Sequence, residues 1–255
     1  MLNPAQIDQY IDAGFTIPDY RVPDETLADI RSAHDRLLEK HPQFADYCPA
    51  LLAFDPGFLN VARTPEILDM VEQLVGADFA LWNSSFFAKP AINGSKTPWH
   101  QDGAYWPIRP LATCSVWIAI DDATTENGCL RFIPGSHKSR ELREHENNPA
   151  PGLSLPLELT ANELDETSAV DITLKAGQVS LHDVFLAHSS DANTSAQPRR
   201  AMTLRYMPTT SVYRRDLVRA TARAGRTGRM DMAERTLYLM RGGDPSGAND
   251  FRIRY

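Results

Sequence analysis

The sequence has 255 residues, enough for one large domain with a substantial hydrophobic core. Hydrophobic residues make up 42% of it and charged residues 23%, proportions typical of globular proteins rather than disordered ones. Its formal net charge of −7 argues against a nucleic-acid-binding protein, because such proteins present a basic surface to phosphates. We therefore expect no nucleic-acid partner, and we leave the oligomeric state open.

Nothing in the sequence predicts secretion or membrane insertion. The cysteines, Cys48, Cys114 and Cys129, are odd in number and have no CxxC spacing, so they indicate neither a disulfide framework nor a zinc site. The first residues lack the basic and apolar regions of a signal peptide, and no apolar run approaches the length of a membrane span. We expect a protein of the reducing cytoplasm without a membrane partner.

The N-terminal part has the periodicity of helices. Asn3, Pro4 and Gln6 have the spacing of an N-cap, a first-turn proline and a capping box, and Gly14 is a typical stop signal. Apolar residues at helical spacing predict further helices. We expect helices at about 4–13, 24–40 and 65–75.

After residue 76 the pattern changes to short apolar runs bounded by turn residues. These runs predict strands at 79–88, 114–120, 128–133, 170–174, 178–182, 184–188 and 200–207. Because no helices are predicted between them, the pattern favours a mainly β protein with flanking helices and a double-stranded β-helix (jelly-roll, cupin-like) core. We expect one domain, with a helical layer at 1–76, the jelly-roll core at 77–210 and a C-terminal helical segment at 211–255.

One long segment, 141–168, interrupts the strands. It contains three prolines and seven acidic residues, and a loop of this length inside a compact domain is usually functional or disordered. Two interpretations stay open. The segment is either a mobile lid or a static excursion that alternating leucines hold against the sheet, namely Leu153, Leu155, Leu157 and Leu159.

The triplet His100-Gln101-Asp102 is the strongest candidate for a metal site. In an extended chain, side chains two residues apart point to the same side, so His100 and Asp102 can reach one point in space. A further histidine would complete a 2-His-1-carboxylate facial triad, which suits ferrous iron and leaves coordination positions open.

A second motif supplies this histidine and a cation. His188 ends the apolar run 184–188, and Arg199 follows eleven residues later at the start of the next predicted strand. Two neighbouring antiparallel strands would bring both side chains to one cavity. A 2-oxo acid would chelate the metal there, while the guanidinium would pair with its distal carboxylate.

With these motifs the sequence resembles the phytanoyl-CoA dioxygenase family of Fe(II)/2-oxoglutarate oxygenases. The stretch 127–138 (NGCLRFIPGSHK) and the stretch 177–190 resemble two further family motifs. The resemblance implies His100, Asp102 and His188 as both the catalytic residues and the ligands of Fe(II). It also implies that Arg199, with Ser190 and Trp117, binds 2-oxoglutarate.

The activity implied is the hydroxylation of a C–H bond in a small or medium metabolite. O2 and 2-oxoglutarate would be consumed, succinate and CO2 released, and ascorbate would act as a supporting reductant. Alternatives are desaturation or cyclisation by the same fold, a halogenase, or a non-catalytic cupin-like binding protein. Because a halogenase lacks the carboxylate ligand and an inactive binding module would lose a ligand, the presence of Asp102 argues against both.

Other residues compete for these roles. His182 and His137 could be ligands on composition alone, but neither has a His-x-Asp partner, and His137 follows a Pro-Gly-Ser turn. Arg200 competes with Arg199, and strand alternation allows only one of them to face the site. Trp117 could equally belong to the core and Ser190 could cap a turn.

The identity of the substrate stays open in the sequence. Five side chains near the motifs are candidates for contacting it: Lys89, Trp99, Tyr105, Trp106 and Arg205. The aromatic side chains would wall an apolar pocket or enclose a cationic group. The basic ones would favour a carboxylate or a phosphorus oxyanion.

Overall fold

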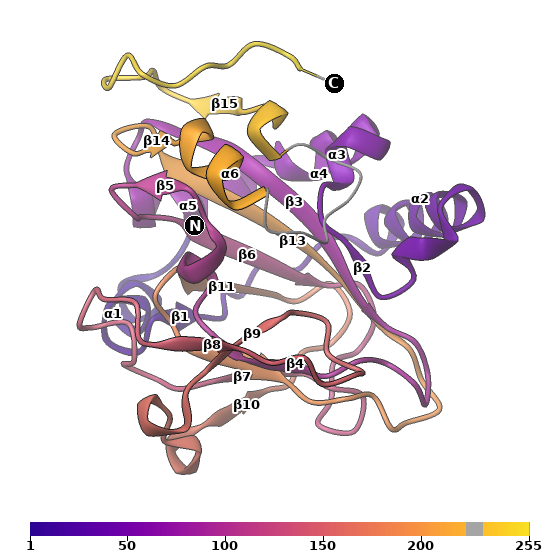
Figure 1. Ribbon diagram of the computed structural model, residues 1–255. Coiled ribbons are helices and arrows are strands. Elements are labelled where there is room, and N and C mark those ends of the chain that lie inside the picture. Colours follow the sequence, from indigo (N-terminus) through magenta and orange to yellow (C-terminus); the bar gives the residue numbers. More distant parts are fainter. Residues whose placement is uncertain (223–231, 255) are drawn as a thin grey trace.

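Two antiparallel sheets face each other in the computed structural model, which describes residues 1–222 and 232–254 (Figure 1). In this part of the chain, the larger sheet has the order β1-β11-β6-β13-β3-β15, with β2 also paired to β3, and the smaller has the order β10-β7-β12-β4. Short pairs form between β14 and β5 and between β8 and β9. This sandwich is the double-stranded β-helix expected from the sequence.

The strands of the larger sheet are β1 (Phe15–Thr16), β2 (Tyr47–Cys48), β3 (Phe79–Lys89), β6 (Cys114–Ala119), β11 (Val179–Asp183), β13 (Arg199–Pro208) and β15 (Tyr238–Arg241). Those of the smaller are β4 (Thr97–His100), β7 (Leu130–Phe132), β10 (Val170–Ile172) and β12 (His188–Ser190). The short pairs are β5 (Ile108–Arg109), β8 (His145–Asn147), β9 (Leu157–Leu159) and β14 (Val212–Tyr213). The helices are α1 (Pro4–Ala13), α2 (Asp24–Lys40), α3 (Leu51–Phe54), α4 (Leu59–Ala62), α5 (Pro65–Val75) and α6 (Arg215–Ala222).

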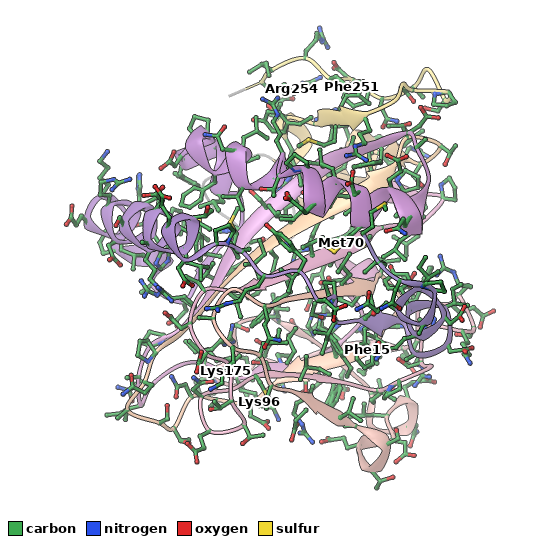
Figure 2. The ribbon with its side chains drawn as sticks, turned by 180° about the vertical axis from the view of Figure 1, so that it is seen from behind. Phe15, Met70, Lys96, Lys175, Phe251 and Arg254 are labelled. Carbon is green, nitrogen blue, oxygen red and sulfur yellow. The ribbon has the colours of Figure 1, made fainter. Side chains whose placement is uncertain are left out.

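The N-terminal helices cover the outer face of the larger sheet, as Figure 2 shows from behind. Ile67 and Met70 of α5 are fully buried in one core cluster with Val116 of β6 and Leu204 of β13. Burying an aliphatic side chain of this size stabilises a fold by about 1.5–3 kcal/mol. The packing of this helical layer therefore stabilises the larger sheet. In the described residues, no helix combines the length and hydropathy needed to cross a membrane.

Helix α1 begins and ends as the sequence predicted. The Asn3 side chain accepts a hydrogen bond from the Gln6 amide, and the Gln6 side chain accepts one from the Asn3 amide, both at 3.0 Å. Gly14 ends the helix with φ 87°, and a Cβ there would lie 2.6 Å from Nδ1 of His137. The His137 ring in turn contacts the Ile11 carbonyl through Nε2 at 3.0 Å. This histidine therefore anchors α1 and is not a metal ligand.

The strand predicted at 184–188 is wrong in its boundaries. Residues 184 and 185 form a turn, 186 and 187 are irregular, and β12 starts at His188, where the predicted strand was to end. Asp183 causes the turn, because its Oδ1 accepts a hydrogen bond from the Phe185 amide at 2.8 Å and its carbonyl accepts one from Leu186 at 3.1 Å. Aspartate commonly forms such local bonds, which compete with strand pairing.

The C-terminal part is only partly helical. Helix α6 covers Arg215–Ala222, residues 223–231 lie outside the described residues, and Tyr238–Arg241 form strand β15 beside β3. Tyr238 and Met240 both pack against the main core, and their two-residue spacing is the period of a strand rather than a helix. The helical interpretation of 211–255 is thus wrong for β15.

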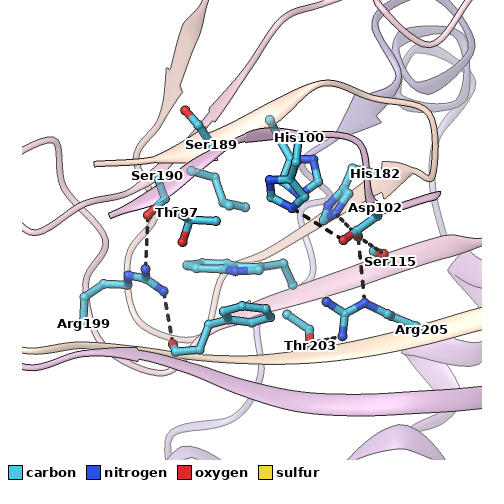
Figure 3. Close-up of a pocket in the computed structure, with 14 residues that line it drawn as sticks. Thr97, His100, Asp102, Ser115, His182, Ser189, Ser190, Arg199, Thr203 and Arg205 are labelled. Carbon is cyan, nitrogen blue, oxygen red and sulfur yellow. Dashed lines mark hydrogen bonds and ion pairs between the residues drawn. The ribbon is translucent and has the colours of Figure 1, made fainter. Parts of the chain in front are cut away.

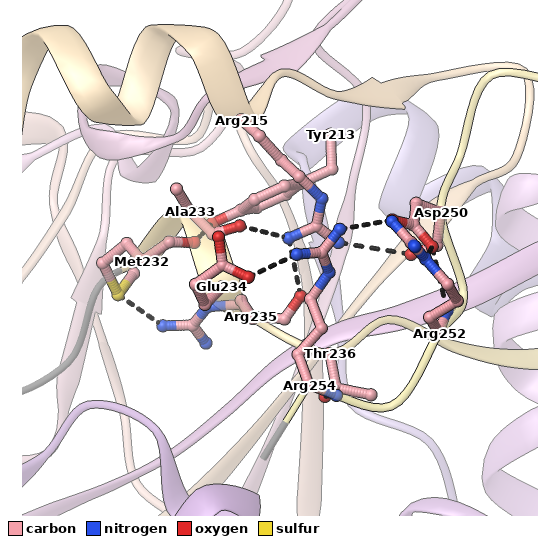
Figure 4. A network of polar contacts seen from close by, with 10 residues as sticks. All are labelled: Tyr213, Arg215, Met232, Ala233, Glu234, Arg235, Thr236, Asp250, Arg252 and Arg254. Carbon is pink, nitrogen blue, oxygen red and sulfur yellow. Dashed lines mark hydrogen bonds and ion pairs between the residues drawn. The ribbon is translucent and has the colours of Figure 1, made fainter.

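Arginines connect the segments of this C-terminal part with one another (Figure 4). The Arg215 Nη1 donates to the carbonyls of Ala233 and Arg235 at 2.5 and 2.8 Å. Arg254 pairs with both Glu234 and Asp250. These contacts join α6, the segment before β15 and the extended terminus into one network.

A buried histidine makes stability depend on pH. His34 of α2 packs on Phe86 with ring centroids 4.3 Å apart, and neither ring nitrogen has a hydrogen-bonding partner in the described residues. Burial, aided by the charge of Arg200, lowers the pKa of His34 to about 4. The unfolded chain therefore binds a proton at higher pH than the folded chain, and stability is lost as pH falls from about 6.5 towards 4.

We predict that His34→Leu removes this dependence. Between neutral pH and about pH 5, the wild-type protein should lose about 2 kcal/mol of its unfolding free energy through this group. The variant lacks the group, so its unfolding free energy should fall by that much less. Urea denaturation of both proteins at neutral pH and at about pH 5 measures the difference. Equal losses in both proteins would contradict the prediction.

The segment 141–168 is a hairpin rather than an open loop. Strands β8 and β9 pair within it, and of the four leucines Leu159 is the one that is fully buried. The hairpin is bonded to residues beside the metal motif. Gln101 Oε1 accepts a bond from the Arg143 amide at 2.8 Å, and the Tyr105 hydroxyl both accepts from the Leu157 amide at 3.0 Å and donates to its carbonyl at 3.1 Å.

We predict that Tyr105→Phe loosens this hairpin. Loss of two hydrogen bonds, each worth about 1 kcal/mol, should speed amide exchange across 145–159 by about tenfold or more. Hydrogen exchange on both proteins measures it, and unchanged exchange would show that these bonds do not hold the segment. The same experiment with substrate tests the lid, since closure over the site should slow exchange throughout 141–168.

Candidate functional site

A cavity between the two sheets brings the sequence motifs together (Figure 3). It is lined by Phe87, Thr97, His100, Asp102, Ser115, Trp117, Leu130, His182, His188, Ser189, Ser190, Arg199, Thr203 and Arg205. Its upper wall comes from the smaller sheet and its floor from β3, β6 and β13 of the larger one. The cavity thus lies inside the jelly roll, between two rigid layers.

His100, Asp102 and His188 converge at one end of the cavity. One ligand atom from each lies within 4.8 Å of the others, and all three residues are buried. His100 ends β4 and His188 begins β12, and the two residues are paired directly across the antiparallel strands. Asp102 begins a 3-10 turn after Gln101, whose extended backbone keeps the carboxylate on the same side as His100.

The two imidazoles are oriented by the backbone. Nδ1 of His100 contacts the Pro98 carbonyl at 2.8 Å, and Nδ1 of His188 contacts the Leu186 carbonyl at 2.9 Å. These contacts leave Nε2 of each ring to face the site, as in most histidine metal sites. Burial, together with the neighbouring His100, holds the pKa of His188 well below its usual value, so its ring is neutral and able to bind a cation.

Asp102 is surrounded by donors. Its Oδ1 lies 3.7 Å from His100 Nε2, while its Oδ2 lies 3.4 Å from Ser115 Oγ and 3.8 Å from both His182 Nε2 and Arg205 Nε. Burial alone would raise the pKa of this carboxyl group, but Arg205 and the two histidines outweigh burial and hold the pKa well below its usual value. The carboxylate is ionised and prepared for a metal.

Arg199 lies at the other end of the cavity. It is buried, its Nη2 donates to Ser190 Oγ at 3.3 Å and its Nη1 to the Phe87 carbonyl at 3.2 Å. The guanidinium lies 5.5 Å from the Trp117 ring centroid, and its Nε has no hydrogen-bonding partner in the described residues. Burial lowers the pKa of Arg199 to about 10, which keeps it protonated at neutral pH. The three residues predicted to bind 2-oxoglutarate therefore adjoin one another.

The strand register is the predicted one, but the sheet arrangement differs. Arg200 points outward and pairs with Asp121 at 2.8 Å, as strand alternation requires. His188 and Arg199, however, are not on neighbouring strands, because β12 belongs to the smaller sheet and β13 to the larger. They face each other across the sandwich.

Four of the five predicted substrate contacts, all except Arg205, do not line the cavity. Lys89 is buried behind Arg199, where its ammonium group donates to the carbonyls of Ser95 and Ser190, and burial, aided by the charge of Arg199, lowers its pKa to about 6. Trp99 alternates with His100 on β4 and therefore points away, into a cluster with Leu159. Strand alternation corrects the prediction for Trp99, whereas the two carbonyl contacts of its ammonium group correct the prediction for Lys89.

Of the other three candidates, Tyr105 and Trp106 only contact residues that line the cavity. Arg205 lines the cavity, and its guanidinium lies 5.1 Å from the Trp106 ring centroid. Trp106 packs on Trp82 at 4.7 Å and supports Arg205 from behind. Tyr105 lies 6.0 Å from the His100 ring, but its hydroxyl is used by the hairpin.

Sequence reasoning missed several lining residues. His182 on β11 was rejected as a ligand, and it stands beside the Asp102 carboxylate rather than within the triad. Thr203 and Ser115 were not singled out. Alternation would have found both, because Thr203 lies between Arg199 and Arg205 on one face of β13, and Ser115 shares a face of β6 with Trp117.

The arrangement fits a ferrous ion. Two imidazoles and one carboxylate on adjoining backbone segments are the donor set of non-haem Fe(II) oxygenases, and all three residues line the cavity. Fold and site thus define a jelly-roll protein with a 2-His-1-carboxylate centre. The family model for phytanoyl-CoA dioxygenase (PhyH) matches residues 2–201, and the chain belongs to this family.

Curated relatives agree with this assignment. The chain is 31% identical over 160 residues to a phytanoyl-CoA dioxygenase domain-containing protein 1 homolog of Dictyostelium discoideum, a match covering 62% of this chain and 57% of the relative. It is 29% identical over 149 residues to a probable alpha-ketoglutarate-dependent hypophosphite dioxygenase of Stutzerimonas stutzeri, covering 58% and 51%. The chain thus spans about half the length of the curated relatives it matches.

Solved structures share the fold. The apo form of the non-heme monooxygenase ThoJ superposes with a TM-score of 0.71 at 24% identity, covering 94% of this chain and 84% of that one. The non-heme alpha ketoglutarate dependent carbocyclase SnoK from nogalamycin biosynthesis has a TM-score of 0.69 at 23% identity, covering 84% and 87%. At these identities the likeness shows the jelly-roll fold.

Proposed function

We propose that this protein is a non-haem Fe(II)- and 2-oxoglutarate-dependent oxygenase that hydroxylates a small or medium metabolite. The observation that carries the proposal is the joint placement of the triad and Arg199 in one buried cavity. A metal triad alone fits many reactions, but a buried guanidinium beside it adds a site for the distal carboxylate of a chelating dianion. The alpha-ketoglutarate dependence in the name of the Stutzerimonas stutzeri relative supports the same cosubstrate.

The chain's own residues have separate tasks. His100, Asp102 and His188 would hold the iron, which when bound supplies the oxidative chemistry with O2 and 2-oxoglutarate. Arg199 and the Ser190 hydroxyl would orient the cosubstrate, with the Trp117 ring as one wall. The two sheets exclude water around these groups, which strengthens each charge interaction.

Hydroxylation is our preferred outcome among those open to the fold. SnoK, a carbocyclase, shows that a similar jelly roll also supports another oxidation, so desaturation or cyclisation is the second candidate. The three cysteines are all free and buried, which accords with a reducing compartment, and we propose the cytoplasm.

Succinate release tests the function. Protein loaded with Fe(II), 2-oxoglutarate and ascorbate in air should release succinate slowly alone and faster when a panel of metabolites includes a substrate. A new hydroxyl oxygen in the product identifies hydroxylation, whereas a product two hydrogens lighter identifies desaturation or cyclisation. Absence of both Fe(II)-dependent 2-oxoglutarate binding and succinate release would reject the proposal.

A further inference from the structure

A second buried arginine lies in the cavity, on the opposite side of the triad from Arg199. Arg205 lies six residues further along β13, on the same face, which corresponds to about 20 Å of strand. Figure 3 shows Arg199 at one end of the cavity and Arg205 at the other, below Asp102. Cosubstrate binding at Arg199 leaves the function of Arg205 unexplained.

Arg205 uses two of its five N–H donors for hydrogen bonds within the described residues. Nη1 donates to Ser85 Oγ at 2.6 Å and to Thr203 Oγ1 at 2.9 Å. Nε has no partner within hydrogen-bonding distance, and in the described residues no bond is made by Nη2, which points into the cavity in Figure 3. Arg205 is only 4% exposed, so water does not replace the missing partners cheaply.

Arg205 also lacks a free counter-ion once iron and 2-oxoglutarate are bound in the site. Asp102 is the only carboxylate among the described residues that line the cavity. Ferrous iron and Arg199 together carry the positive charge that Asp102 and a 2-oxoglutarate dianion neutralise. Arg205 then remains as one buried cation, and its one ionic neighbour among the described residues, Asp102 at 3.8 Å, is engaged by the metal.

Aromatic rings shield this cation. The guanidinium lies 5.7 Å from the Phe87 ring centroid and 5.1 Å from that of Trp106. Such rings stabilise a cation but supply no hydrogen-bond acceptor, and they keep the local dielectric constant low. An anion reaching Nη2 would therefore be bound strongly.

We propose that Arg205 is the binding site for a singly charged oxyanion group of the substrate, either a carboxylate or a phosphorus oxyanion. This inference rests on the proposed function, because the charge count assumes iron and 2-oxoglutarate. It defines the substrate as a small anion whose charged group is held beside Asp102, which places the bonds next to that group at the metal. Larger neutral metabolites would leave the cation buried and unpaired.

A rival explanation is that Arg205 merely orients the Asp102 carboxylate. That role would make Arg205 important for metal affinity and irrelevant to anions. The two explanations differ in a binding measurement that needs no turnover.

The test uses protein loaded with Mn(II) and saturating 2-oxoglutarate under nitrogen, so that Arg199 is occupied and no oxidation occurs. Calorimetric titration with acetate and with hypophosphite, which are monoanions, is compared with neutral acetamide. We expect at least one monoanion to bind at least tenfold more tightly than acetamide, and the preferred probe distinguishes a carboxylate from a phosphorus oxyanion. No preference for either anion over acetamide would overturn the proposal.

Variants locate the effect. Arg205→Gln should weaken binding of the preferred anion at least tenfold, Arg205→Lys should retain a preference for the anion over acetamide, and Arg200→Gln on the outer face should bind as wild type. Equal anion binding in wild type and Arg205→Gln would overturn the proposal. If Arg205→Gln fails to fold, the Arg205→Lys variant decides, and loss of its preference for the anion over acetamide would overturn the proposal. The 2-oxoglutarate titration in wild type comes first, because its failure rejects the proposed function itself.

Discussion

Replacing Asp102 or His188 by alanine is expected to abolish succinate formation and to weaken Fe(II) binding at least about a hundredfold. Each residue provides one of three protein ligand atoms that lie within 4.8 Å of one another, so its loss leaves an incomplete donor set. In the Asp102 variant an additional effect arises, because Arg205 loses the carboxylate that it faces and leaves its positive charge beside the metal.

Matched substitutions separate ligand loss from general damage. Asp171→Ala and His41→Ala change the same residue types outside the cavity and should retain wild-type Fe(II) affinity. Metal affinity is measured by equilibrium dialysis and activity by succinate release. Retention of more than a small fraction of activity by either ligand variant would reject the triad.

Replacing Arg199 by alanine is expected to raise the 2-oxoglutarate concentration needed for half-maximal activity by about a hundredfold, while Fe(II) affinity stays nearly constant. The lost interaction is a charge-assisted pair in a buried setting, and breaking such a pair typically costs a few kcal/mol. Arg199 lies at the end of the cavity away from the triad, which is why metal binding should be spared.

The adjacent arginine is the control for Arg199. Arg200 pairs with Asp121 and Asp35 on the outer face of the sheet, so Arg200→Ala should leave the 2-oxoglutarate requirement unchanged. Direct 2-oxoglutarate titration of both variants, followed by succinate release, measures the difference. A larger effect from Arg200→Ala would contradict the assignment of the cosubstrate site.

Local signals in the sequence predicted much of this structure. The capping box of Asn3 and Gln6 and the stop at Gly14 define α1 because they depend on neighbouring residues alone. The triad was predictable because His100 and Asp102 are separated by one extended residue, Gln101. Their convergence with His188 relied on the resemblance to a known family, since no local rule places β12 beside β4.

What the sequence did not reveal depends on contacts between distant segments. Lys89 sits on the same strand as Phe87 and was expected at the substrate, yet its ammonium group is held by the carbonyls of Ser95, after β3, and Ser190, at the end of β12. Trp99 lies on the face of the smaller sheet that packs against the hairpin, while the opposite face of this sheet lines the cavity. Both faces are buried, so the apolar character of Trp99 fits either. Apolar patterning cannot distinguish two buried faces.

The division of the site between the sheets has a consequence for stability. The metal ligands come from β4, β12 and the turn after β4, whereas Arg199 and Arg205 come from β13 of the opposite sheet. Ligands that contact both groups of residues would connect the two sheets through the interior of the sandwich. Because ligands that bind only the folded state shift the unfolding equilibrium by RT ln(1 + [L]/Kd), metal and cosubstrate together should raise the melting temperature more than metal alone. The loaded protein should then resist separation of its two sheets, and proteolysis that depends on such opening should slow.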